Sequence, residues 1–382
     1  MKSALSLLLI LSINALLGQA PTFQDVDYVG NGDPKQFLDV YIPPNLNAPA
    51  PMVMYIHGGA WVSGQKGGAM SFLDSLYSSG YIIVDINYRL RQDSIWPAQI
   101  FDCKTAVRFL KANANTYSID TCRMGVIGTS AGAHLAAMLG TSNGTMEGLH
   151  LGSTGVSTRI NAVISLFPAV DFFQMQAHMD TNCPPTSMTH CSYNSAEARL
   201  LGCDSCVMCP AKVTSANPIT YIDPSDPPFK VMHGDSDCGI PWHQSFLLDS
   251  ALNANNVNSS LHLIPGAVHS DPWFRTDSAQ GIYRGFFDAN LSPCFLTGTN
   301  ENYSVNDFSV FPNPATGHVQ IIMPGIVKEC RVLLSEINGK VLQCMKYSSI
   351  SVEMALSGYS KGIYFITVES AIGNITKKLI IQ

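Results

Sequence analysis

The feature that most constrains the fold is a serine between two glycines, placed where an apolar run meets a helix-like run. The segment Gly128-Thr129-Ser130-Ala131-Gly132 follows the apolar residues 124–127 and precedes the helix-forming residues 133–139. Because glycines permit a tight turn, this order predicts a strand, a turn and a helix, with the serine hydroxyl at the carboxyl edge of a sheet. The same five-residue pattern also arises by chance as a plain turn, so its meaning depends on its surroundings.

The N-terminus and the charge balance narrow the class of protein. Residues 1–20 begin with Met1-Lys2, continue with an apolar run from Leu5 to Leu17 and end in small residues. This is typical of a secretory signal peptide, and the run is shorter than the roughly 20 residues that span a bilayer, so we expect no membrane span. Charged residues are 13% of 382 and the net charge is -6. That composition argues against binding to nucleic acid or to an anionic membrane.

Short apolar runs alternate with amphipathic stretches from Phe23 to about Asn290. This alternation is typical of strands joined by crossover helices, and it predicts a doubly wound, mostly parallel α/β domain over residues 21–295. Helices are predicted over 97–113 and 242–252. The predicted strands are 37–42, 52–56, 81–86, 123–127, 161–167, 229–233 and 261–264.

Residues 178–217 interrupt this rhythm with five cysteines, several prolines and many small polar residues, and we interpret them as an inserted loop or lid. The spacing of Cys203, Cys206 and Cys209 is that of a zinc site. Because export removes the chain from the reducing cytosol, disulfides are the favoured interpretation and no metal is expected. Sequence fixes no connectivity. Further candidate pairs are Cys103–Cys122, Cys238–Cys294 and Cys330–Cys344.

The composition shifts again after Pro293. Residues 296–306 are polar and predict a linker, and residues 307–382 hold short alternating runs that predict a small all-β sandwich. Phe311-Pro312-Asn313-Pro314 is a chain-breaking cluster, and Asn338-Gly339 is a hairpin signal. The predicted strands are 319–323, 331–337, 340–346, 363–368 and 377–381.

A serine hydroxyl is a weak nucleophile, so an imidazole must accept its proton and a carboxylate must orient that imidazole. Two loops that follow predicted strands supply these groups in the order acid, then histidine, that the serine turn requires. We therefore predict Ser130, Asp237 and His269 as the catalytic residues. The competing residues, for which ordinary turn or strand roles are favoured, are Asp235, His233 and His262.

A tetrahedral intermediate also needs backbone N–H donors aimed at its oxyanion. The segment His57-Gly58-Gly59-Ala60-Trp61 follows a predicted strand, and its glycines let the backbone approach a substrate closely. We predict an oxyanion hole formed by Gly58, Gly59, Ala60 and Ala131. The histidines at 57 and 134 are interpreted as structural. Three tryptophans near these loops are weaker candidates for lining a substrate pocket: Trp61, Trp96 and Trp273.

Taken together, these motifs resemble those of known esterases with the α/β-hydrolase fold. They are similar to hormone-sensitive-lipase-like enzymes and, more closely, to the bifunctional feruloyl and acetyl-xylan (BD-FAE-type) esterases. The resemblance covers roughly Val26 to Asn290. It is carried by HGGAW at 57–61, WPAQ at 96–99, GTSAGAHL at 128–135 and HGDSDCGIP at 233–241.

The resemblance implies the chemistry of a serine carboxylic-ester hydrolase. Such enzymes form an acyl-enzyme on the serine, here Ser130, and use no metal or organic cofactor. Thr129 and Ala133 stand where hormone-sensitive-lipase relatives usually carry an acidic residue and a second glycine. This departure favours the polysaccharide-esterase branch, whose substrates carry acetyl or feruloyl groups.

The C-terminal segment resembles the type A sorting domain of the type IX secretion system. The resemblance is carried by FPNP at 311–314, NGKV at 338–341, GIYF at 362–365 and the basic pair at 377–378. It implies an export address, with the type IX machinery as partner and a secreted or cell-surface destination. An ordinary carbohydrate-binding sandwich is the alternative.

The leading hypothesis is therefore a secreted serine esterase that acts on acylated polysaccharide or oligosaccharide. Two alternatives stay open at this point. One is a secreted serine peptidase of the same fold, and the other is a non-catalytic surface glycan-binding protein built on a hydrolase scaffold.

Overall fold

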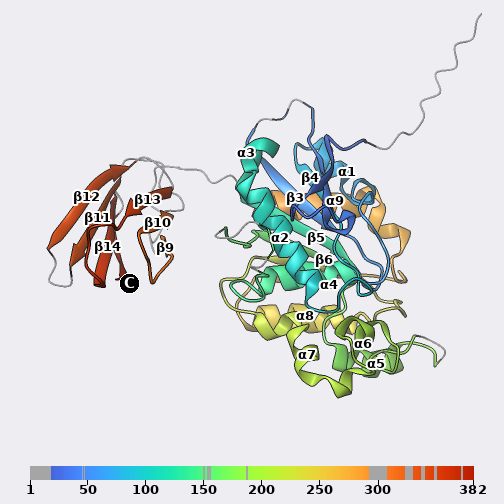
Figure 1. Ribbon diagram of the computed structural model, residues 1–382. Helices are drawn as coiled ribbons and strands as arrows, with labels where there is room; N and C mark the ends of the chain where they lie inside the picture. The colour runs from blue at the N-terminus through green and yellow to red at the C-terminus, as the bar shows by residue number, and fades with distance from the viewer. Residues whose placement is uncertain are drawn as a thin grey trace, which may run out of the picture. The chain divides into compact units, whose positions relative to one another are not determined.

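The computed structural model describes residues 19–44, 46, 48–148, 151–152, 156–185, 188–291, 308–322, 330–336, 340–347, 351–370 and 373–382. Most of the predicted signal peptide and the whole predicted linker lie outside these residues. The chain divides into two compact units, Met1–Phe295 and Leu296–Gln382 (Figure 1). Among the residues described, no helix combines the length and the apolar character needed to cross a bilayer.

The first unit is built on an eight-stranded sheet with the strand order β1-β2-β4-β3-β5-β6-β7-β8. The strands from β4 through β8 in that order run parallel, and β1 and β2 add an antiparallel edge. The bounds are β1 Phe23–Asp27, β2 Phe37–Tyr41, β3 Ala50–Ile56, β4 Ile82–Ile86, β5 Ile119–Thr129, β6 Ala162–Leu166, β7 Phe229–Gly234 and β8 Ser259–Ile264. The predicted doubly wound α/β class is confirmed. Each strand predicted for this unit is present, and β1 was missed because its residues are mostly polar and partly exposed.

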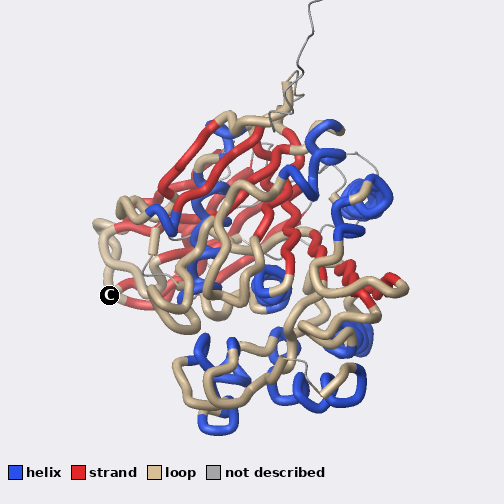
Figure 2. The backbone as a smooth tube through the Cα atoms, turned by 90° about the vertical axis from the view of Figure 1, so that its right-hand side faces the viewer, coloured by secondary structure: helices blue, strands red, loops and turns tan. Residues whose placement is uncertain are grey.

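Helices cover both faces of this sheet (Figures 1 and 2). Helices α1 (Met70–Ser78) and α9 (Asp277–Asn290) contribute to one apolar core. The other core includes α2 (Ala98–Ala112), α4 (Ala131–Thr141) and α8 (His243–Ala254), and the short α3 (Ala114–Tyr117) lies at its margin. Because side chains alternate along a strand, two covered faces require strands that are apolar on both sides. Every residue of α4, which follows the serine turn, is buried.

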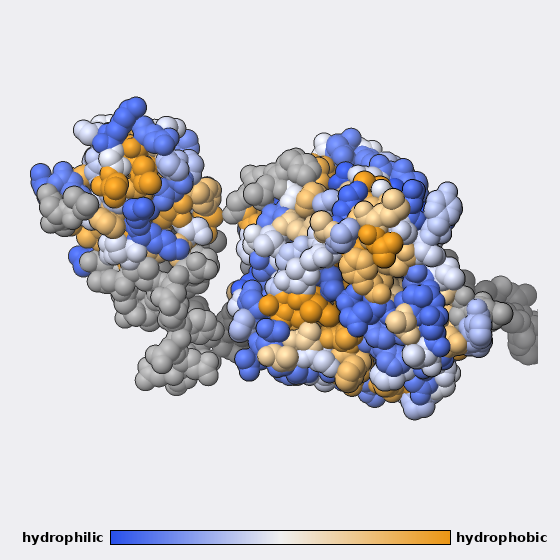
Figure 3. Space-filling model, turned by 90° about the horizontal axis from the view of Figure 1, so that it is seen from below, coloured by the Kyte–Doolittle hydropathy of each residue, from blue (hydrophilic) through white to orange (hydrophobic). Residues whose placement is uncertain are grey.

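A helical insertion lies between β6 and β7. It contains α5 (Phe172–Asn182), α6 (Ala196–Leu201) and α7 (Pro210–Ser215), with the 3-10 turns η2 (Cys206–Met208) and η3 (Pro218–Tyr221). The segment 178–217 that sequence marked as a loop or lid falls within it. Several large apolar side chains of the insertion are exposed, and Figure 3 shows apolar surface on the face seen from below. The exposed apolar side chains of the insertion are Phe173, Met188, Tyr193, Val207 and Met208.

Disulfides hold the insertion together and tie it to the rest of the unit. Cys191 bonds to Cys206, and Cys203 bonds to Cys209. A third bond joins Cys183, just after α5, to Cys238 in the loop between β7 and α8. The candidate pair between position 238 and position 294 is therefore wrong. In the part of the chain that the structure describes, no cluster of three or more metal-ligating side chains is found.

The two other candidate pairs are also wrong. Cys103 is a buried thiol of α2 and Cys122 is an exposed thiol of β5, and neither forms a disulfide. Cys344 is free as well, because the strand register places it opposite Leu333 rather than opposite Cys330.

The second unit contains two antiparallel sheets, ordered β13-β10-β9 and β12-β11-β14-β15. Its bounds are β9 Ser309–Phe311, β10 His318–Ile322, β11 Cys330–Glu336, β12 Val341–Tyr347, β13 Ser351–Ala355, β14 Gly362–Ser370 and β15 Gly373–Ile381. Alternate residues of the strands form one apolar core. The small all-β class is confirmed. The five predicted strands are present, β9 and β13 are additional, and the predicted turn at Asn338-Gly339 lies outside the described residues.

The buried aromatic ring of Phe287 on α9 gives a test of the core. This ring fills the space beside Gly125 of β5, and the side chain is fully buried. We expect Phe287→Ala to lower the free energy of unfolding by about 3–5 kcal/mol, because it leaves a cavity. Urea denaturation measures the change. The control is Phe246→Ala on α8, where the ring is 52% exposed and the expected change is below about 0.5 kcal/mol. Equal losses in the two variants would contradict this packing.

Candidate active site

Ser130 stands at the sharp turn between β5 and α4. Its backbone has φ +53° and ψ -119°, a strained conformation for a residue with a side chain. A Cβ atom on Gly128 would overlap the carbonyl of Gly132, and a Cβ atom on Gly132 would overlap the carbonyl of Ile56 at the end of β3. The N–H of Ser130 donates to the Leu166 carbonyl at 2.9 Å. Glycine is therefore needed at 128 for the turn to close on itself and at 132 for the turn to pack against β3.

The three residues predicted to be catalytic lie in hydrogen-bonding contact. Ser130 Oγ is 3.0 Å from His269 Nε2, and His269 Nδ1 is 2.7 Å from Asp237 Oδ2. These residues follow β5, β8 and β7, so parallel strands deliver them to the same edge of the sheet. Because an ionised carboxylate can only accept, the hydrogen lies on His269 Nδ1 and the lone pair of Nε2 faces the serine. This is the tautomer that can accept a proton from the hydroxyl.

Asp237 is fully buried, and all its acceptor capacity is used. Its Oδ1 accepts the backbone N–H groups of Gly239 at 2.7 Å and Ile240 at 2.9 Å. Its Oδ2 lies 2.7 Å from the ring of His269 and 3.1 Å from the ring of His233. Burial alone would raise the pKa of Asp237, but the hydrogen bonds from the His233 and His269 imidazoles hold that pKa well below its usual range. The carboxylate therefore stays ionised.

The competing residues occupy other positions. Asp235 Oδ1 accepts the N–H of Gly266 at 2.7 Å and the hydroxyl of Ser236 at 3.0 Å, which is a turn-stabilising role. His262 lies on β8 with its ring stacked 6.1 Å from that of Trp273. Neither side chain makes a hydrogen bond to Ser130 or His269 among those found in the described residues.

The two histidines interpreted as structural support the loops around the serine. The ring of His57 stacks on Tyr88 at 4.4 Å, and its Nδ1 lies 2.7 Å from the Gly58 carbonyl. His134 Nε2 donates to the Ala216 carbonyl at 2.7 Å. Burial, partly offset by this hydrogen bond, lowers the pKa of His134 to about 4, so the ring is neutral at pH 7.

Two of the tryptophans pack against His134 on α4, the helix that follows Ser130. Trp61 and Trp96 are only 2% and 3% exposed, and their rings lie 5.4 and 5.5 Å from that of His134. Trp273 is partly buried beside His262. Their part in a substrate pocket stays a prediction.

The loop after β3 has an unusual backbone. Gly59, Ala60 and Trp61 all have positive φ angles, of +114°, +52° and +57°. The N–H of Ser63 donates to the Gly59 carbonyl at 3.0 Å and closes the loop. A Cβ atom on Gly59 would overlap the Ser63 carbonyl, so this position requires glycine. Gly58 lies against the serine turn, since a Cβ atom there would come within 2.8 Å of the carbonyl oxygen of Thr129.

This loop and the start of α4 leave backbone donors unused. Within the described residues, the N–H groups of Gly59, Ala60 and Ala131 donate to no protein acceptor. Ala131 is the first residue of α4, where N–H groups lack partners in the helix and the helix dipole favours negative charge. Donors free at this point are the kind of group that can stabilise an oxyanion.

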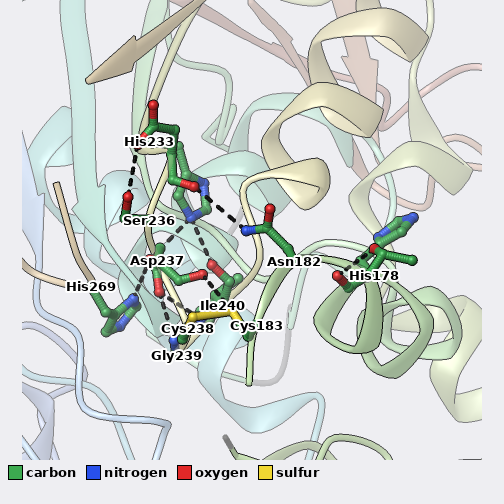
Figure 4. The surroundings of a disulfide bond; sticks show 12 residues. His178, Asn182, Cys183, His233, Ser236, Asp237, Cys238, Gly239, Ile240 and His269 are labelled. Carbon is green, nitrogen blue, oxygen red and sulfur yellow. Dashed lines mark hydrogen bonds and ion pairs between the residues drawn. A yellow bond between two sulfur atoms is a disulfide. The ribbon is translucent and has the colours of Figure 1, made fainter. Parts of the chain in front are cut away.

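Figure 4 shows two features of the acid loop that were not predicted from the sequence. The disulfide between Cys183 and Cys238 anchors the loop directly beside Asp237. His233, at the end of β7, contacts the same carboxylate oxygen as His269, the Oδ2 atom of Asp237. The first had a signal in the sequence, since a cysteine directly follows the acid. The second could be found only from the loop conformation.

The fold and the site together define the class of protein. A doubly wound, mostly parallel sheet with serine, acid and histidine after β5, β7 and β8 is the α/β-hydrolase fold. Residues 38–252, more than half of the chain, match the BD-FAE family. The chain belongs to the BD-FAE family.

Similar proteins agree with this assignment. Esterase LipC of Mycobacterium tuberculosis is 30% identical over 241 residues, which cover 62% of this chain and 57% of LipC. This chain thus spans a little over half the length of that curated relative. A solved truncated carbohydrate esterase from gut microbiota is 28% identical with a TM-score of 0.63, and the match covers 70% of this chain and 95% of that one. A bifunctional GH43-CE protein of Bacteroides eggerthii is 32% identical with a TM-score of 0.62, over 71% and 35%.

The C-terminal unit has its own match. Residues 309–382 match the secretion system C-terminal sorting domain. The resemblance to such a sorting domain is confirmed.

The disulfide beside the acid loop can be tested by its removal. We expect the double substitution Cys183→Ser and Cys238→Ser to lower the free energy of unfolding by about 2–4 kcal/mol, because it frees a closed loop of 55 residues. Thermal or urea unfolding under non-reducing conditions measures the change. Cys122→Ser, at an exposed free thiol, is the control and should leave stability unchanged. An unaltered double variant would contradict the bond.

Proposed function

We propose that the protein is a secreted serine carboxylic-ester hydrolase that removes acetyl or feruloyl groups from polysaccharide. The observation that carries the proposal is the continuous chain of contacts from Ser130 to His269 to Asp237, at 3.0 and 2.7 Å. Unused backbone donors lie in the loop after β3 and at the start of the helix behind the serine. A nucleophile, a base, an orienting acid and oxyanion donors are the groups that acyl transfer needs.

The proposed reaction uses these groups in two steps. Ser130 Oγ attacks the ester carbonyl carbon while His269 Nε2 accepts the hydroxyl proton. The negative oxygen of the tetrahedral intermediate is held by the loop of Gly58, Gly59 and Ala60 together with the N–H of Ala131. His269 then gives its proton to the leaving alcohol, which leaves the acyl group on Ser130. Water, activated by the same imidazole, attacks this acyl-enzyme and releases the acid.

The proposed substrate class rests on the family and on the similar proteins. The two solved proteins described above carry the names carbohydrate esterase and GH43-CE. The BD-FAE assignment favours acetyl and feruloyl esters of polysaccharide over lipid esters. Exposed apolar side chains on the insertion, which the Cys183–Cys238 bond ties to the acid loop, are suited to contact with an aromatic acyl group.

The proposed route out of the cell uses both ends of the chain. Residues 1–20 would act as the signal peptide, and the sorting domain over 307–382 would be recognised by the type IX secretion machinery. The esterase domain would span 21–295, with 296–306 as the linker. The match of the C-terminal unit to a sorting domain supports this division.

The nucleophile is tested by Ser130→Ala. We expect kcat for p-nitrophenyl acetate to fall at least about a thousandfold in a folded variant, and covalent labelling by a fluorophosphonate to disappear. The matched control is Ser236→Ala, at an exposed hydroxyl that contacts Asp235, and it should keep both properties. Undiminished turnover in the Ser130 variant would refute the proposal.

The choice of acid is tested by comparing two neighbouring aspartates. Asp237→Asn replaces an acceptor by an amide that can donate to His269, so the ring loses its required tautomer. We expect kcat to fall by about four orders of magnitude. Asp235→Asn, whose carboxylate faces Gly266, should stay within about threefold of the parent. The opposite order of effects would assign the acid role to Asp235.

The substrate is tested on purified full-length protein. We expect release of acetate from acetylated xylan or of ferulate from feruloylated oligosaccharides, together with faster turnover of short than of long p-nitrophenyl esters. Cleavage of peptide amides without ester hydrolysis would instead identify a peptidase.

A further inference from the structure

A second imidazole, that of His233, also contacts the buried carboxylate of Asp237. His233 ends β7 and is fully buried. Its Nε2 lies 3.1 Å from Asp237 Oδ2 and 2.9 Å from the carbonyl oxygen of Ile240. Its Nδ1 lies 2.6 Å from Ser245 Oγ on α8. Figure 4 shows His233 and His269 reaching Asp237 from different elements.

These contacts decide where the hydrogen on His233 lies. A backbone carbonyl can only accept, so the Nε2 atom that faces Ile240 must carry the hydrogen. In the neutral ring Nδ1 is then an acceptor, and it takes the hydroxyl hydrogen of Ser245. The Nε2–H group is consequently shared between the Ile240 carbonyl and the Asp237 carboxylate.

Asp237 Oδ2 therefore has two imidazole donors rather than one. We propose that His233 is a positioning residue that acts through Asp237, fixing the carboxylate and limiting how strongly Oδ2 attracts the Nδ1 hydrogen of His269. Its effect on rate rests on the function proposed above. Its effect on the hydrogen bond between Asp237 and His269 does not.

The other titratable groups near His233 and Asp237 do not supply this second hydrogen bond to the carboxylate. Asp235 directs its carboxylate to Gly266 and Ser236, away from the ring. His243 on α8 and His178 on α5 stack on each other at 5.1 Å, and burial lowers the pKa of both below the usual value, which favours their neutral forms. Among the described residues, Asp237 is the ionised group that hydrogen-bonds to His233.

The main test replaces the donor. His233→Leu removes the N–H and should leave Oδ2 more basic. A hydrogen bond to a charged group is commonly worth about 1.5 kcal/mol or more, so we expect the acid limb of kcat/KM against pH to move up by about one unit. We also expect kcat to fall about tenfold, with KM changed less than about twofold.

Two further variants separate positioning from simple packing. His233→Gln keeps an N–H that can reach the same acceptors, and it should restore kcat to within about threefold and return the acid limb to its parental position. Ser245→Ala keeps the ring but removes the hydroxyl that hydrogen-bonds to its Nδ1 atom and holds the ring in place. It should shift the acid limb in the same direction by a smaller amount, and it serves as the test if the leucine variant fails to fold.

The hydrogen bond can be observed without a substrate. Proton NMR of the full chain should show a low-field imidazole resonance that His269→Ala removes. Its pH midpoint should rise by about one unit in His233→Leu and return in His233→Gln. Folded leucine and alanine variants with the parental midpoint and kcat would overturn the inference. If the midpoint moves but the parent protein hydrolyses no ester, the proposed function fails and the role of His233 at Asp237 stands.

Discussion

The burial of the Asp237 carboxylate is the interaction on which the rest of the site depends. A charge removed from water is costly unless donors replace its hydration, and here four donors do so. Two come from the loop backbone after β7, one from His233 at the end of that strand and one from His269 after β8. The carboxylate is therefore both ionised and fixed in direction. A fixed acid in turn fixes the tautomer and the orientation of the imidazole that faces Ser130.

The parallel sheet brings Ser130, Asp237 and His269 together at one edge. Residues that are far apart in sequence follow neighbouring strands, and the carboxyl ends of those strands share one edge. The turn at Ser130 keeps its strained backbone because Gly128 lets the turn close tightly on Gly132 and Gly132 lets it pack against the end of β3. A disulfide from the insertion adds a covalent anchor at Cys238, next to the acid. The strand ends, the glycine contacts and the disulfide thus all lie beside the residues predicted to be catalytic.

Much of this arrangement could be predicted from the sequence, because the patterns that indicate it are local. Apolar runs located the strands, and motif order pointed to Ser130, Asp237 and His269, which the fold brings into contact. Other features depend on distances that a linear pattern does not contain. The bond between Cys183 and Cys238 joins residues 55 positions apart, and the contact of His233 with the acid arises from a loop rather than from helical spacing. The edge strand β1 was missed because half-exposed polar residues give no clear alternation.

The central claim is that Ser130 becomes covalently acylated during turnover. The direct measurement is mass spectrometry of the protein quenched in acid during hydrolysis of an aryl acetate or a feruloyl ester, followed by peptide mapping. The account predicts one acyl group per chain, located on the peptide that contains Ser130 and absent from the Ser130→Ala variant. Ester hydrolysis with no adduct under conditions where deacylation is slow, or an adduct on a different residue, would contradict it.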